Sequence, residues 1–285
     1  MLFEDDLLWS KYTRTFDQRN NYFLFQTLPV RILLNLFAVV LVVSCAPSAD
    51  SNSVTKEENP SAEGFNMENS DEEAIVLADQ VMKAMGGRQA YDNTSCIQWT
   101  FFGRRTLTWD RINHRCRIDI PSDSTSIMIN LEDDSGWAMV ADESISHPDS
   151  LAQLMDQGRR IWINDSYWLV MPFKLKDSGV TLKYGGPAST LDGRSSKQLE
   201  LTFENVGVTP QNKYLVYVDD SSGLVSQWDF YTNATDTVPR FSTPWSDYEA
   251  HGDILLSGNR GRGSLTDIQV MTEIDEGLFA DPAGE

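Results

Sequence analysis

The feature that most constrains the fold of this chain is a long series of short segments in which apolar and polar residues alternate. Ile97, Trp99 and Phe101 are each separated by one polar residue, and such runs recur almost to the end of the sequence. Alternation over about four to eight residues is typical of strands with one buried face, and short turns between them favour antiparallel neighbours. The runs predict strands at residues 97–101, 107–109, 116–120, 127–131, 137–139, 180–184, 199–203, 214–218, 225–230, 245–248, 254–256 and 268–270.

Two helices are expected beside these strands. One runs from about Asp71 to Met85, where apolar residues recur at helical spacing, and Gly86-Gly87 ends it. The other covers Pro148–Arg160. Because a sheet of so many strands tends to curl or close, the sequence predicts a mainly β, α+β domain with a large curved antiparallel sheet.

The segment from Trp162 to Phe173 is the densest in aromatic residues. Asn164 and Asp165 lie among its rings, and an aromatic surface with a few polar groups is typical of a ligand pocket. The alternative is a core segment whose Asn and Asp make turn hydrogen bonds. Pro172 excludes a central strand, so the end of the segment is expected at an edge or in a loop. The predicted ligand-binding residues are Trp99, Phe101, Trp109, Trp162, Asn164, Asp165, Tyr167, Trp168 and Trp228.

A lipidation signal is expected near the N-terminus. The segment Leu41–Cys45 resembles a bacterial lipobox, and the apolar run before it is too short to span a bilayer but suits a signal peptide. The sequence therefore predicts cleavage before Cys45 and lipidation of that cysteine. Residues 1–22 are polar and acidic, unlike a signal peptide, so we expect the true translation start to lie after Met1.

Three regions follow from this signal. Residues 1–44 are expected to be a signal peptide with an N-terminal extension, and residues 45–69 a lipidated cysteine with a disordered acidic tether. Residues 70–285 are expected to form one domain. The net charge of −19 resides after the cleavage point, because residues 1–44 carry equal numbers of acids and bases. Such an acidic chain repels nucleic acid, which we exclude as a partner.

Cys96 and Cys116 are the other two thiols of the chain. An oxidising envelope permits a disulfide between them. Against it, a simple meander places them on the first and third strands, about 9–10 Å apart, whereas a bridge needs Cα atoms within about 7 Å. The alternative is two small buried thiols.

Signals of catalysis are weak. His114, His147 and His251 lack metal-site spacing, and we find neither a nucleophile elbow nor a P-loop. The glycine-rich stretch Gly258–Gly263 is interpreted as a hairpin. We expect no metal, no cofactor, no enzymatic activity and a monomeric chain.

Several motifs resemble a group of uncharacterised bacterial secreted lipoproteins. They cover about residues 70–280 and comprise Met85-Gly86-Gly87, Thr108-Trp109-Asp110, Trp162–Pro172, Lys176–Val180, Val206–Pro210 and Ser226-Gln227-Trp228. That group resembles the LolA/LolB-like lipoprotein-carrier superfamily in fold. The resemblance implies an incomplete half-barrel, with two or three helices on its open side and a concave apolar cavity.

Three functional hypotheses follow. The first is an envelope protein, anchored by its lipid and most consistent with the outer membrane, that binds a lipid, acyl chain or other apolar ligand in the concave face. The second is a hydrolase of an envelope or dietary polymer. The third is a structural or interaction module with a filled core, in which the aromatic side chains are fully packed.

Overall fold

A computed structural model describes residues 58–204 and 206–284 of the chain. By its contacts the chain divides into a unit of residues 1–53 and a unit of residues 54–285, and the described residues all belong to the second. Cys45 and the predicted signal peptide lie outside the described residues, so the lipidation site stays a prediction.

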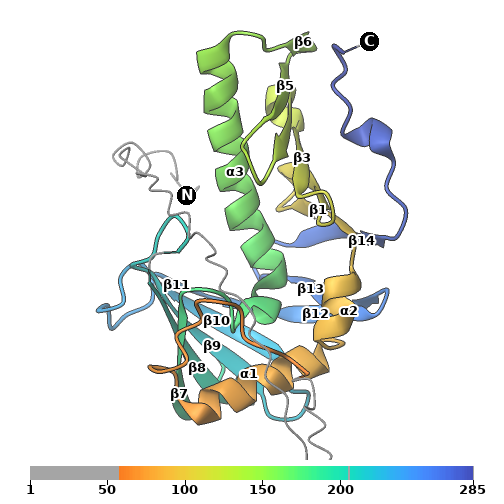
Figure 1. Ribbon diagram of the computed structural model, residues 1–285. Coiled ribbons are helices and arrows are strands. Elements are labelled where there is room, and N and C mark those ends of the chain that lie inside the picture. Colours follow the sequence, from red (N-terminus) through yellow and green to blue (C-terminus); the bar gives the residue numbers. More distant parts are fainter. Residues whose placement is uncertain (1–57, 205, 285) are drawn as a thin grey trace, which may run out of the picture. The chain divides into compact units, whose positions relative to one another are not determined.

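Seven antiparallel strands form the larger sheet, called sheet A here (Figure 1). Their order is β14-β1-β2-β3-β4-β5-β6, so among the described residues the last strand pairs with the first. Alternate residues are fully buried on one face, called the inner face, because their side chains are apolar and large. The strands are β1 Cys96–Phe101, β2 Arg105–Asp110, β3 Arg115–Ile120, β4 Thr125–Asn130, β5 Gly136–Val140, β6 Glu143–Ser144 and β14 Leu265–Met271.

Five further antiparallel strands form sheet B, in the order β11-β10-β9-β8-β7. A separate two-stranded hairpin, β12–β13, contacts both β10 of sheet B and β14 of sheet A. The strands are β7 Val180–Ser189, β8 Ser195–Phe203, β9 Lys213–Asp219, β10 Val225–Tyr231, β11 Phe241–Pro244, β12 Ser246–His251 and β13 Ile254–Asn259.

The architecture confirms a mainly β fold that resembles an incomplete barrel with covering helices. Across residues 58–204 and 206–284, every sheet has an open strand order and none closes on itself. The predicted single large sheet is instead divided, because the chain leaves sheet A after β6, crosses through a long helix and starts sheet B at β7.

That crossing helix is α3, which spans Pro148–Val170 and runs on into the 3-10 turn η2, Met171–Lys174. The predicted helix ended at Arg160, because the aromatic run after it obscures the helical period. In the structure Gly158, Ile161, Asp165 and Leu169 lie on one buried face at spacings of three and four residues. The aromatic segment is therefore helical, and Pro172 lies in η2 rather than at a strand edge.

Two shorter helices precede the sheets. Helix α1, Glu72–Ala84, agrees with the predicted range to within one residue at each end, and it packs against β7 and η2. Helix α2, Arg88–Asn93, follows the two glycines and was not predicted. Gly86 has a positive φ of 110° and approaches the backbone of Asp253 too closely for a side chain, so the turn between the helices requires glycine.

Residues 58–69 pack on the domain, although the sequence assigned them to a disordered tether. Phe65 is buried in the main core, and the backbone amide of Ala62 donates to the carbonyl of Lys176. The Asn59 side chain donates to Asp79 at 2.7 Å. One aromatic ring and these hydrogen bonds anchor a segment whose composition alone looked unable to fold. The ordered domain thus begins before residue 70.

Candidate functional site

Helix α3 brings the predicted aromatic residues together in two groups. The first group lies against the inner face of sheet A. Trp99 and Phe101 of β1 are buried there, and Trp109 of β2 meets Trp162 of α3 edge to face with ring centroids 5.6 Å apart. These rings contribute to the main core of the domain.

The second group lies where the C-terminal half of α3 packs on sheet B. Trp168 meets the buried Trp228 of β10 edge to face at 4.8 Å, and Tyr167 lies 6.0 Å from the same ring. Tyr214 stacks on Trp228 at 4.9 Å, and Phe241 stacks on Trp168 at 5.8 Å. All of the predicted aromatic residues therefore lie on α3 or on the strands that it covers.

The two predicted polar residues lie differently. Asp165 is fully buried and accepts two hydrogen bonds from Arg105, from Nε at 2.6 Å and from Nη2 at 2.8 Å. Asn164 is exposed and donates to the same carboxylate at 2.9 Å. Burial raises the pKa of Asp165, while the Arg105 guanidinium opposes that rise. This carboxylate is thus engaged within the protein, and Asn164 points its amide at Asp165.

Four of the predicted residues bury a hydrogen-bond donor that has no acceptor among the described residues. They are Trp99, Trp162 and Trp228, through their indole nitrogens, and Tyr167, through its hydroxyl. Burial raises the pKa of Tyr167 well above its usual value, so the hydroxyl remains protonated. A buried donor without a partner costs about 1–3 kcal/mol, and native proteins contain few of them. Their gathering around one helix marks this interface as unusual.

The inner face of sheet A is filled by α3. At Gly158 a Cβ atom would lie 2.9 Å from Cγ2 of Ile127, which is closer than side chains pack, so helix and sheet approach as far as glycine permits. A recess of about 350 Å³ opens at one end of this interface. Its lining comes from the β1–β2 turn, the 3-10 turn η1 (Pro121–Asp123) and α3, and includes Arg104, Arg105, Ile120, Gln157 and Ile161.

Arg260 is a buried cation that the sequence gave no reason to single out. It is 3% exposed, and its Nη2 donates to the carbonyl of Trp168 at 2.7 Å, in the last turn of α3. The guanidinium lies 3.6 Å from the ring of Trp245. Burial lowers the pKa of Arg260 to about 9. A cation on the carbonyls that end a helix is favourable, so Arg260 fixes the C-terminal end of α3.

Cys96 and Cys116 are both free and buried. Cys96 pairs with Asp110 of β2, whereas Cys116 pairs with Trp109, the next residue along that strand. Neighbouring residues of a strand point to opposite faces, so the two thiols face away from each other. This register explains why no bridge joins them.

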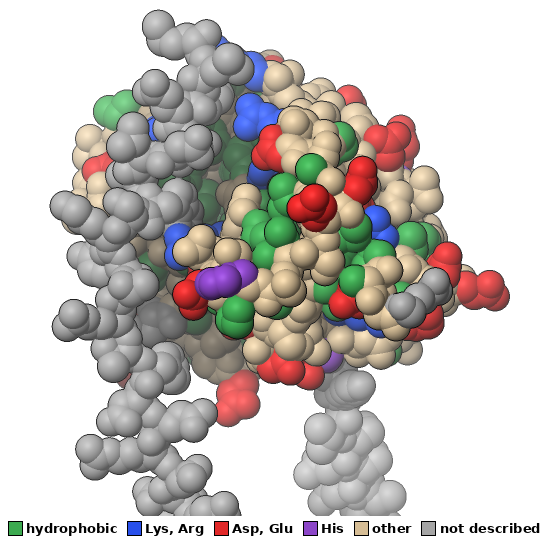
Figure 2. Space-filling view, turned by 90° about the horizontal axis from the view of Figure 1, so that it is seen from above, with side chains coloured by type: hydrophobic (Ala, Val, Ile, Leu, Met, Phe, Trp, Pro, Cys, Tyr) green, Lys and Arg blue, Asp and Glu red, His purple; other side chains and the backbone are tan. Residues whose placement is uncertain are grey.

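Three further properties of the described residues concern metal sites, membrane-spanning helices and charged patches. Within the described residues, no three metal-ligating side chains gather to hold an ion, and no helix has the length and apolarity needed to cross a membrane. In the view of Figure 2, acidic side chains are scattered between apolar and basic ones and do not form one patch.

Two arginines at this site were missed by the sequence interpretation, although a signal for one existed. Arg105 precedes Leu107 and Trp109 at a spacing of two, which places it on the inner face. Arg260 gave no comparable signal, because its burial depends on packing from α3 and Trp245.

Comparison with known proteins finds distant structural neighbours. No protein-family model and no curated protein matches the chain. Similar solved structures include a DUF1329 family protein from Desulfovibrio piger, at 14% identity and a TM-score of 0.40, covering 74% of this chain and 98% of that one. An outer membrane lipoprotein-sorting protein domain from Vibrio parahaemolyticus aligns at 10% identity and a TM-score of 0.35, covering 73% of this chain and 96% of that one. A LolA superfamily protein from Nitrosomonas europaea aligns at 10% identity and a TM-score of 0.36, covering 74% of this chain and 98% of that one.

Proposed function

We propose that this chain is a lipid-anchored protein of the bacterial cell envelope that binds an acyl lipid or similar amphiphile between α3 and the sheets. The supporting observation is the set of buried donors on Trp99, Trp162, Tyr167 and Trp228, which have no acceptor among the described residues. An amphiphile offers apolar chains to the surrounding rings and ester or phosphate oxygens to the donors.

Entry of such a ligand requires α3 to move away from sheet A, because the two are in close contact at Gly158. The recess beside Arg104 and Ile161 is where the interface meets solvent, so a chain would enter there. Arg104 is exposed at the rim, where its charge suits an anionic headgroup.

The anchor at Cys45 is part of the same proposal. A diacyl modification there would hold the domain beside a membrane, in the outer membrane by our expectation, with the segment before Asn59 joining the two. We infer a monomeric binding protein without enzymatic activity, cofactor or nucleic-acid partner.

Binding can be tested with the full chain carrying Cys45→Ser, produced in a bacterial envelope and examined by native mass spectrometry. We expect a co-purified lipid, and uptake of a fluorescent fatty acid by the delipidated protein. Trp228→Phe keeps an aromatic ring, although a smaller one, and removes one donor, so it should weaken uptake by about twofold to tenfold. Leu191→Ala, at a side chain that is 79% exposed, is the matched control and should change nothing.

The second candidate is an interaction module with a filled core. The contact of Gly158 with Ile127 favours it, since α3 already occupies the inner face. Failure to find a lipid, together with no uptake of the fatty acid, would leave this candidate in place of the first.

A further inference from the structure

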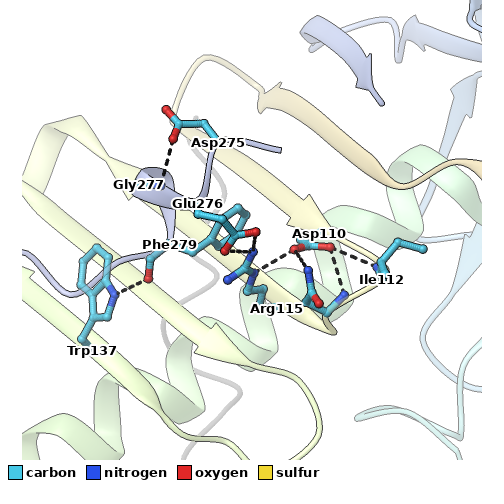
Figure 3. A network of polar contacts seen from close by, with 9 residues as sticks. Asp110, Ile112, Arg115, Trp137, Asp275, Glu276, Gly277 and Phe279 are labelled. Atoms are coloured by element: carbon cyan, nitrogen blue, oxygen red, sulfur yellow. Dashed lines mark hydrogen bonds and ion pairs between the residues drawn. The ribbon is translucent and has the colours of Figure 1, made fainter. Parts of the chain in front are cut away.

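A segment near the C-terminus lies across the outer face of sheet A, opposite α3 (Figure 3). This segment, residues 272–280, is called the C-terminal strap here. It follows β14 and contains one 3-10 turn, η3, Glu276–Leu278. The backbone amides of Leu278, Phe279 and Ala280 donate to carbonyls within the strap itself. The strap therefore lies on the sheet without adding a strand to it.

Arg115 of β3 binds the strap at two points. Its Nη2 donates to both carboxylate oxygens of Glu276, at 2.8 and 2.7 Å. Its guanidinium carbon lies 4.1 Å from the centre of the Phe279 ring, a cation–π contact. One arginine thus contacts both a carboxylate and the aromatic ring three residues further along.

Two more side chains of the sheet bind the strap backbone. Trp137 of β5 donates its indole hydrogen to the carbonyl of Phe279 at 3.0 Å, and Arg117 of β3 donates to the carbonyl of Leu278 at 3.0 Å. Phe279 itself is only 4% exposed. Proteins recognise peptides with donors to main-chain carbonyls, with cations that bind acidic side chains and with pockets that hold an aromatic ring.

The receiving side chains are held in place without the strap. Asp110 is fully buried, accepts hydrogen bonds from Ile112 and Asn113, and binds Nε of Arg115 at 2.8 Å. Arg117 is held by Asp119 at 3.0 Å, although this carboxylate is 34% exposed. The site therefore keeps its form when the strap leaves, and a preorganised site loses little entropy on binding.

The strap is anchored at Phe279, but the residues before it are held weakly. The Glu276 side chain is 71% exposed, and the residues between Met271 and Glu276 make no backbone hydrogen bond to sheet A within the described chain. Segments with few buried contacts open locally at low cost. Release of the strap exposes two arginines and an indole to other ligands.

We propose that the outer face of sheet A is a peptide-binding site, lined by Arg115, Arg117 and Trp137, for a segment of another protein that carries a carboxylate three residues before an aromatic ring. The chain's own strap occupies the site and competes with that segment. The site is basic and the strap is acidic, so we expect the partner segment to be acidic as well.

The test uses the full chain with Cys45→Ser and with the strap released by Glu276→Gln and Phe279→Ala. The probe is a fluorescent synthetic peptide with the sequence of residues 272–284, and fluorescence anisotropy measures its binding. We expect saturable binding to the strap-released variant, and at least about tenfold weaker binding to the chain with its native strap, which competes. Peptides carrying Glu276→Gln or Phe279→Ala should bind much more weakly, as should a strap-released variant that also carries Arg115→Ala.

Two results would overturn the proposal. One is no binding of the peptide by a strap-released variant that still unfolds cooperatively. The other is strap-dependent dimerisation in sedimentation equilibrium, because the occupant in trans would then be a second copy of this chain. If the strap-released variant does not fold, the chain with its native strap serves instead. Excess peptide should then displace the strap and speed its cleavage after Glu273 or Glu276 by a glutamate-specific protease.

Discussion

Arg105 and Asp165 join the start of β2 to the middle of α3 through two hydrogen bonds, of 2.6 and 2.8 Å. The carboxylate has no exposed surface, and the arginine side chain is 21% exposed. Removing one partner of a buried pair leaves the other charge uncompensated, which is more costly than the pair itself is favourable. The pair therefore controls how firmly α3 is attached to sheet A.

Asp165→Asn should lower the free energy of unfolding by about 3 kcal/mol, because Arg105 keeps its charge and loses its counterion. Urea unfolding followed by tryptophan fluorescence measures the change. Asp92→Asn is the control, since Asp92 pairs with Arg88 on an exposed helix face and should cost no more than about 0.5 kcal/mol. Equal effects for the two variants would contradict this role of Asp165.

Gly158→Leu should separate α3 from sheet A, because the new side chain would overlap Ile127. We expect a loss of about 2 kcal/mol in stability from overpacking. If α3 covers a ligand site, the same variant should also take up more fluorescent fatty acid. Gln153→Leu adds a leucine at an exposed position of the same helix and serves as the control. A destabilised Gly158→Leu chain without increased uptake would speak for the filled-core module.

Acid should weaken the contact between Asp110 and Arg115. Burial alone would raise the pKa of Asp110, but hydrogen bonds from Asn113 and Arg115 outweigh it and hold the pKa below its ordinary value. A carboxyl with a lowered folded-state pKa stabilises the fold above its unfolded pKa of about 3.9, and that stability is lost as the pH falls through the folded value. Asp110→Asn should therefore be less stable than the native sequence at pH 7, by about 2 kcal/mol.

The pH dependence supplies the check on that prediction. Between about pH 5 and about pH 2 the difference in unfolding free energy between Asp110→Asn and the native sequence should shrink, because the stability that a lowered pKa gives is lost as the pH falls. A difference in unfolding free energy that stays constant over this range would contradict a lowered pKa of Asp110 in the folded protein.

The two buried thiols should be unreactive in the folded domain. Burial raises the pKa of Cys96 to about 11 and that of Cys116 well above its usual value, so neither is a thiolate near neutral pH. In a Cys45→Ser chain, Ellman's reagent at pH 8 should detect both thiols in urea and react slowly with both in native buffer. A reductant should leave the melting temperature unchanged, and a shift on reduction would reveal a disulfide that the register forbids.

The strands were predictable because each alternating run carries its own evidence of burial. Ile97, Trp99, Leu107 and Ile118 are fully buried on the inner face, as their alternation indicates. Helix α3 was harder, since the aromatic residues after Arg160 are common in strands and fill more than one face of the helix. Its full length depends on packing against both sheets.

The candidate site was predictable in its aromatic residues and much less so in its charges. Trp162, Tyr167 and Trp168 all lie on α3, but Trp228, which meets Tyr167 and Trp168, lies far away in sequence. The C-terminal strap shows the same limit, because Glu276 gives no local sign that Arg115 receives it. Contacts between distant residues follow from the topology of the sheets and have no local signature.

The pairing of β14 with β1 also has a consequence for the order of assembly. Cys96 lies beside Met271 in sheet A, so β1 gains its second neighbour only from a segment about 170 residues further along the chain (Figure 1). Until β14 has reached it, one side of β1 has unpaired amides and carbonyls. Contacts between such distant segments close slowly. Sheet A must therefore remain incomplete, and in need of protection from other strand edges, until β14 reaches β1.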